Sequence, residues 1–219
     1  MGFNRSMLTV SNRLISMCAA FYLLICATLF PSTLLAEPAF QFHTLDKQDG
    51  MISSVVYDIA QDNDGFMWFA TEDGLVKYDG FEFINYRHSR LDENSLSNNG
   101  VRTLLFDNNG RLWVGTDGGV NLYRKNLDNF ENIVLSTSED EQVKVNQRRT
   151  LFQSLDGTIW VGSGLGLHSI NPETKKHKTF PQFKVRTIFE DDKYYFDTNT
   201  SASNYFNKQK QQYKEMCVF

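Results

Sequence analysis

The side chains best suited to metal binding or proton transfer are seven carboxylates near turn glycines: Asp62, Asp64, Asp107, Asp156, Glu72, Asp73 and Asp117. Such carboxylates can bind calcium or act as acid–base pairs. The run Asp62–Gly65 faintly resembles a calcium loop. Its glycine, however, stands at the fourth position instead of the sixth, and Asp73 stands where a glutamate is needed. Hydrogen bonds to neighbouring backbone explain acidic turn residues fully, so we expect no metal site.

Other catalytic patterns are missing from the chain. His43, His88, His168 and His177 show no metal-ligand spacing. No serine nucleophile motif, phosphate-binding glycine loop or Cys-x-x-Cys occurs. The basic run Lys175–Lys178 is interpreted as a solvated hairpin loop. We therefore predict a non-enzymatic chain with no catalytic residues and no cofactor, whose ligand-binding residues the pattern leaves unknown.

The strongest pattern is an internal repeat. Three segments centred on Trp68, Trp113 and Trp160 align without gaps, at spacings of 45 and 47 residues. This period is typical of β-propeller blades. Aromatic residues make up 14% of the chain and there are only 4 prolines, a composition that favours strands.

Each copy can be interpreted strand by strand. An apolar strand is followed by an Asx-Gly turn, then by the tryptophan strand, which ends in a hydroxyl residue before a second glycine turn. Two further strands complete a four-stranded antiparallel blade. A tryptophan at the same place in every blade indicates packing between sheets. The blade signature comprises Trp68, Trp113, Trp160, Gly65, Gly110, Gly157, Gly74, Gly119, Gly166, Thr71, Thr116 and Ser163.

A fourth, degenerate copy runs to the C-terminus, with Phe196 where tryptophan is expected. Before the first copy, Phe40–Leu45 alternates like a strand and is a candidate ring-closing strand. The polar stretches Arg87–Asn99 and Ser136–Asn146 are predicted to be exposed loops. The expected organisation is an entry segment over 37–54 and blades over 55–99, 100–146, 147–183 and 184–219.

The first 36 residues differ in kind. Arg5 and Arg13 precede an uncharged run over 14–30, which Pro31 breaks before a small residue at Ala36. This pattern predicts a signal peptide over 1–36, with an uncleaved signal anchor over 14–30 as the alternative. Cys217 is then the one cysteine of the mature chain, so no internal disulfide framework is expected.

The in-register pattern of Asp-x-x-Gly, Trp, Gly-Thr and Gly-Leu resembles the two-component regulator propeller family from Phe40 to about Tyr213. The segment Tyr78-Asp79-Gly80-Phe81 also resembles the sequence pattern of that family. The resemblance implies an all-β propeller in the periplasmic sensor region of a histidine kinase or diguanylate cyclase. Rings of the family hold about seven blades, so four blades imply a partial ring and a truncated chain without its output domain. A closed four-bladed ring is the alternative.

The leading functional hypothesis is therefore an exported, periplasmic ligand-sensing module in bacterial signal transduction. Its expected partner is a small molecule or saccharide, and the remaining blades or another chain are further candidate partners. The net charge of −4, with no basic block, argues against nucleic acid. Membrane contact is expected only through the N-terminal segment. A propeller-fold lyase or hydrolase and a protein-interaction scaffold are the alternative functions.

Overall fold

The computed structural model describes residues 44–135, 150–164, 166–180, 185, 187–190, 194–199, 202–207 and 212–216. The predicted signal segment over 1–36, most of the candidate strand Phe40–Leu45 and the loop Ser136–Asn146 lie outside these ranges. Across the described part of the chain, no helix has the length and apolar character needed to cross a bilayer. The short 3-10 helix η1 (Lys47–Asp49) precedes the first strand.

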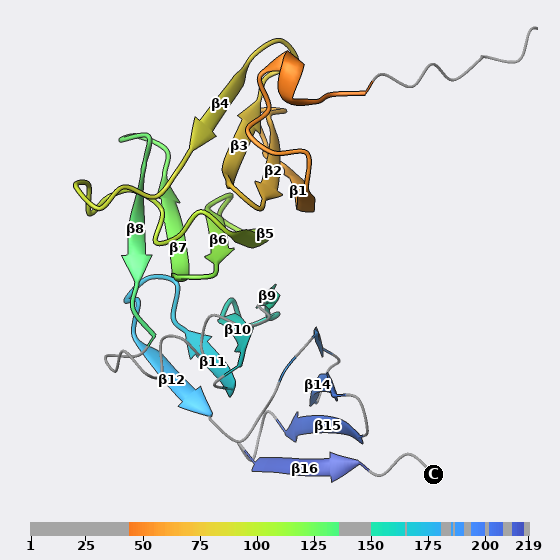
Figure 1. Ribbon diagram of the computed structural model, residues 1–219. Coiled ribbons are helices and arrows are strands. Elements are labelled where there is room, and N and C mark those ends of the chain that lie inside the picture. The colour runs from red at the N-terminus through yellow and green to blue at the C-terminus, as the bar shows by residue number, and fades with distance from the viewer. Residues whose placement is uncertain are drawn as a thin grey trace, which may run out of the picture. The chain divides into compact units, whose positions relative to one another are not determined.

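In the residues that the structure describes, sixteen strands form four sheets of four antiparallel strands, each in sequential order (Figure 1). This arrangement confirms the prediction of an all-β chain with four strands per repeat. The first sheet contains β1 (Val56–Gln61), β2 (Met67–Thr71), β3 (Gly74–Tyr78) and β4 (Phe83–Tyr86). The second contains β5 (Val101–Phe106), β6 (Leu112–Thr116), β7 (Gly119–Arg124) and β8 (Asn129–Ile133). The third contains β9 (Thr150–Gln153), β10 (Ile159–Ser163), β11 (Gly166–Ile170) and β12 (His177–Phe180), and the fourth β13 (Ile188–Glu190), β14 (Tyr194–Asn199), β15 (Ala202–Asn207) and β16 (Gln212–Met216).

The turn between the first two strands of each of the first three sheets uses the predicted Asx-Gly pair. Its glycine has a positive φ in all three copies, at 92° in Gly65, 74° in Gly110 and 87° in Gly157. Side chains with a Cβ are disfavoured in this region, which explains why glycine recurs there. The preceding acidic side chain also binds the turn backbone: Asp107 Oδ1 accepts from the amides of Asn109 and Arg111 at 3.0 and 2.9 Å.

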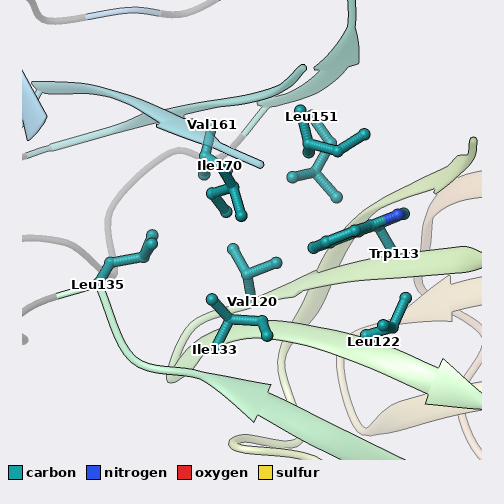
Figure 2. Close-up of a cluster of buried hydrophobic side chains, with 9 residues drawn as sticks. Trp113, Val120, Leu122, Ile133, Leu135, Leu151, Val161 and Ile170 are labelled. Atoms are coloured by element: carbon teal, nitrogen blue, oxygen red, sulfur yellow. The ribbon is translucent and has the colours of Figure 1, made fainter. Parts of the chain in front are cut away.

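The sheets pack face to face, and each tryptophan belongs to one interface. Residues paired across strands share a sheet face. Trp113 of the second sheet packs with Leu151, Val161 and Ile170 of the third sheet (Figure 2). Trp68 of the first sheet packs in the same way against the second sheet. The tryptophans are at most 6% exposed, so they form the hydrophobic core between sheets.

The fourth sheet, described through its backbone, has the register of the third. Phe189 pairs with Phe196 as Phe152 pairs with Trp160. Phe206 pairs with Tyr213 as Ile170 pairs with His177. Phe196 therefore lies at the tryptophan position, where the repeat pattern places it.

The stretch Arg87–Asn99 is only partly the exposed loop that its composition predicts. Leu91 is 99% exposed, but Leu96 is 0% exposed and belongs to the core cluster around Trp68. The amide of Ser97 donates to Asn121 Oδ1 at 2.9 Å, which ties the loop to strand β7. The sequence did not predict the burial of Leu96, because the residues around it are polar.

Candidate functional site

A cleft of about 540 Å³ lies between the turns of the first and second sheets. Three turns form it: β1–β2 of the first sheet and β5–β6 and β7–β8 of the second. Its size is within the range of small-molecule sites. The lining residues are Asp62, Asn63, Asp64, Trp68, Phe106, Asn109, Gly110, Arg111, Leu112, Leu122, Tyr123, Arg124, Lys125 and Asn126.

Trp68 is the largest aromatic side chain in the lining of the cleft. Its indole Nε1 donates to Asp62 Oδ2 at 2.9 Å, so the β1–β2 turn holds the ring in place. Tyr123 meets the Trp68 ring edge-on at a centroid distance of 5.0 Å, and Tyr86 stacks on it at 5.9 Å. The two tyrosines come from different sheets, so this aromatic group spans the contact between the first and second sheets.

Asp128 fastens the two tyrosines together. The hydroxyls of Tyr86 and Tyr123 both donate to Asp128 Oδ1 at 2.6 Å. Burial, followed by the hydrogen bond to Asp128, raises the pKa of Tyr123 to about 12 and raises that of Tyr86 as well. The same two hydroxyls hold the pKa of Asp128 below its usual value. All three groups therefore keep their ordinary charge states at neutral pH.

An exposed ion pair crosses the cleft. Lys125 Nζ of the second sheet contacts Asp64 Oδ2 of the first, and this hydrogen bond raises the pKa of Lys125. Their side chains are 72% and 45% exposed, so the pair adds little stability and can open. Arg124 is held elsewhere, through Asn94 Oδ1 at 2.6 Å and Asn129 Oδ1 at 2.9 Å.

The remaining polar groups suit binding better than catalysis. The amide side chains of Asn63, Asn109 and Asn126 line the cleft and can both donate and accept hydrogen bonds. The charged groups next to them are occupied by protein partners. The cleft therefore offers neutral hydrogen-bonding groups beside aromatic edges, with one ion pair that a ligand can displace.

The junction between the second and third sheets differs at the corresponding place. Lys175 has the register position of Asp128, and both have a positive φ, at 59° and 51°. The Lys175 ammonium lies 5.1 Å above the centroid of Trp113 and donates to the Pro172 carbonyl at 2.6 Å. Burial lowers its pKa. The interpretation of this run as a solvated loop is therefore wrong for Lys175, which covers the tryptophan that the first junction leaves beside a cleft.

The predicted acidic residues have more partners than turn chemistry supplies. Asp107 accepts from Trp113 Nε1 at 3.0 Å and from Arg111 Nε at 2.7 Å. Burial tends to raise its pKa, but these hydrogen bonds outweigh burial and lower it. Two more carboxylates lie in ion pairs, Asp73 with Arg87 and Asp117 with Arg102. The interpretation that turns explain these residues fully is therefore incomplete. Within the residues that the structure describes, no three potential metal ligands gather.

The hydroxyl residues of the repeat lie at the ends of the tryptophan strands. Thr71, Thr116 and Ser163 donate to the carbonyls of Gly74, Gly119 and Gly166 at 2.7, 3.1 and 3.2 Å. Each hydroxyl closes the turn that follows its strand. These contacts give the recurring hydroxyl a structural part in every repeat.

His168 contacts a serine, which the sequence analysis of histidine spacing did not predict. His168 Nε2 is 2.9 Å from Ser163 Oγ, and its Nδ1 is 3.0 Å from Thr179 Oγ1. His168 is 0% exposed and Ser163 is 1% exposed. A substrate cannot reach this pair, so its contribution is to the packing of the third sheet.

Sequence reasoning missed the cleft residues Tyr123 and Lys125, and it missed Tyr86 and Asp128, which contact Tyr123 beside the cleft. They lie outside the repeat signature and come from strands and turns that meet only through packing of neighbouring sheets. The alignment of Asp128 with Lys175 was the one available signal, because opposite charges at one repeat position indicate a junction that differs.

The stacked four-stranded sheets, each with a tryptophan strand, place the chain among β-propeller repeat proteins. Residues 50–73 and 95–118 match the family described as two component regulator propeller. The chain therefore carries two-component regulator propeller repeats, which confirms the resemblance. The third repeat, around Trp160, lies outside both matched ranges but shares the strand order and register of the other two.

The chain is similar in sequence or in structure to known proteins of two-component systems. A histidine kinase of Formosa agariphila is 33% identical over 100 residues, which are 44% of this chain and 6% of that protein. Two solved extracellular domains of proteins described as hybrid two-component systems of B. thetaiotaomicron are similar in structure. One has a TM-score of 0.69 at 22% identity, covering 80% of this chain and 26% of that one. The other has a TM-score of 0.61 at 18% identity, covering 80% and 27%. The chain thus spans about a quarter or less of each relative.

Proposed function

We propose that this chain is a periplasmic ligand-sensing propeller module of bacterial signal transduction, in a two-component or cyclic-di-GMP pathway. The observation that carries the proposal is the in-register repeat of the family, in a fold similar to extracellular domains of two-component systems. In this function the chain recognises a molecule outside the cytoplasm. The output is made by another domain.

The cleft over Trp68 is the proposed ligand site. It joins two sheets, so a bound ligand contacts both and changes how firmly they are held together. The exposed pair of Lys125 and Asp64 is the contact that a ligand displaces at small cost. The lining asparagines favour an uncharged polar ligand, such as a saccharide or a small metabolite.

Thermal denaturation of the purified chain across a panel of saccharides and metabolites tests the proposal. A ligand at 100 times its Kd stabilises a protein by about 2.7 kcal/mol. For a chain of this length that corresponds to a rise in Tm of roughly 5–10 °C. Absence of any shift across the panel would count against a sensing function.

Two variants test whether the ligand binds in this cleft, independently of whether the chain has a sensing function. The double variant Asn63→Ala, Asn126→Ala removes two hydrogen-bonding side chains from the cleft lining and should weaken binding at least 10-fold. Arg87→Ala is the matched control, because Arg87 forms an exposed ion pair with Asp73 outside the cleft lining. It should leave the Kd within about twofold. Equal affinity in all three proteins would keep the sensing function and reject this cleft as its site.

A further inference from the structure

Two tyrosines from neighbouring sheets share one hydrogen-bond acceptor beside the cleft. The hydroxyls of Tyr86 and Tyr123 both donate to Asp128 Oδ1, each at 2.6 Å, so the two phenol oxygens lie at most twice that distance apart. The ring centroids are 6.0 Å apart, with 65° between the ring planes. In the described part of the chain, no other two tyrosines are in ring contact. The junction of the first two sheets therefore holds a pair of phenols within reach of each other.

The junction of the second and third sheets shows that packing does not require these phenols. Ile133 and Ile170 have the register positions of Tyr86 and Tyr123 there. Both isoleucines are buried in the cluster around Trp113, and neither can give up a proton or an electron as a phenol does. Of these two junctions, only the first has the tyrosine pair and its carboxylate. Its chemistry thus goes beyond what the contact between two sheets needs.

The shared carboxylate makes both tyrosines easier to oxidise. A phenol that donates to a carboxylate can lose its proton to that group as an electron leaves, which avoids a charged phenol intermediate. Asp128 accepts from both hydroxyls and is itself exposed, so it can pass each proton on to water. Trp68 contacts both rings, at centroid distances of 5.9 Å to Tyr86 and 5.0 Å to Tyr123. An electron removed from this group of rings can therefore be drawn from either tyrosine.

We propose that Tyr86 and Tyr123 are the site of an oxidative cross-link, a dityrosine, that joins the first and second sheets covalently. A one-electron oxidant, such as peroxidase-activated hydrogen peroxide, removes one electron from each tyrosine, and the phenolic protons leave through Asp128 to water. The unpaired electron of each tyrosyl radical is shared with the ring carbons next to the oxygen. One such carbon from each ring forms the new C–C bond, and the hydrogen on each bonded carbon moves to the phenol oxygen of its ring. In sum, two electrons pass to the oxidant and two protons to water.

The cross-link changes the stability of the chain in a measurable direction. It closes the segment between Tyr86 and Tyr123 into a loop, which restricts the unfolded chain more than the folded one. The cross-linked chain should therefore unfold at a higher urea concentration than the untreated chain. The reaction needs no bound ligand, so it is independent of the proposed sensing function.

Photo-oxidation of the purified full chain with ruthenium tris-bipyridine and persulfate tests the proposal, at low protein concentration so that chains rarely meet. The product should have single-chain mass and dityrosine fluorescence. Mass spectrometry of its tryptic digest should show the peptide that contains Tyr86 joined to the peptide that contains Tyr123, with the loss of two hydrogens. Tyr86→Phe and Tyr123→Phe keep both rings and should each abolish this joined peptide. Tyr57→Phe is the matched control, because Tyr57 is 45% exposed and lies outside the pair, and it should leave the yield unchanged.

Asp128→Asn tests the part of the carboxylate. Asparagine keeps the size of the side chain and an oxygen that accepts from the phenols, but it does not take up a proton, so the link should form at least about 10-fold more slowly. An unchanged rate would overturn this part of the mechanism. Absence of the joined peptide in oxidised wild type, its persistence in Tyr86→Phe, or links found only between chains would each overturn the proposal. Circular dichroism of each variant verifies that it is folded.

Discussion

Replacement of Asp107 by alanine should destabilise the chain more than the equivalent change at Asp62. Both residues begin an Asx-Gly turn and accept a hydrogen bond from the indole of the repeat tryptophan, Trp113 and Trp68 respectively. Only Asp107 also binds an arginine, with Arg111 Nε at 2.7 Å, and its side chain is 0% exposed.

The magnitude follows from these contacts. Asp107→Ala leaves the Nε1–H of a fully buried tryptophan without its acceptor and removes one of the two carboxylates that bind Arg111, which keeps Glu173 at 2.9 Å. The unsatisfied indole donor costs about 1–3 kcal/mol and the lost charged hydrogen bond about 1.5–3 kcal/mol, so a total of about 3–5 kcal/mol is expected. At Asp62 the carboxylate is only half-buried and has no arginine partner, so water replaces part of what is lost. A cost of about 1–2 kcal/mol is expected there.

Urea unfolding followed by tryptophan fluorescence measures both changes. Above pH 5, Asp107→Ala should lower the free energy of unfolding by at least 1 kcal/mol more than Asp62→Ala does. The folded-state pKa of Asp107 is lowered, so its contribution is complete above the unfolded pKa of about 3.9 and is lost as pH falls through the folded value. The gap between wild type and Asp107→Ala should therefore narrow in acid. Equal costs for the two variants at neutral pH would refute this account of the turn.

Two further predictions concern the junction of the first two sheets. Leu96→Ala should cost about 2–5 kcal/mol in urea unfolding because Leu96 is 0% exposed, whereas Leu91→Ala, at a 99% exposed site in the same stretch, should cost less than about 0.5 kcal/mol; similar costs would mean that the stretch is a free loop. In alkaline titration at 295 nm, Tyr123 and Tyr86 should ionise after the exposed tyrosines, and Asp128→Asn should shift Tyr123 back toward 10, because a carboxylate that accepts from a phenol favours its protonated form. The stabilisation from Tyr123 is complete below pH 10 and is lost as pH rises through about 12, and an unchanged titration in Asp128→Asn would contradict the assigned contact.

The repeat was predictable because its information is local. Asx-Gly turns need a residue that accepts positive φ, and strands need apolar side chains at alternate positions, so both leave a pattern in neighbouring residues. The register of the fourth sheet was predictable for the same reason, although its tryptophan is replaced by Phe196. Leu96 was not, because one buried residue in a polar stretch has no periodicity.

The candidate site depends on which turns come together. Tyr86 and Asp128 are 42 residues apart in the chain, and they meet only because the first and second sheets pack face to face. The same packing decides that Ile59 is exposed while Leu104, its repeat equivalent, is buried. The sequence by itself determined the blade, because a blade is built from short-range turns and strand pairs. Only the tertiary structure decided where the cleft lies and which repeat positions are buried, because both are properties of the contact between one blade and the next.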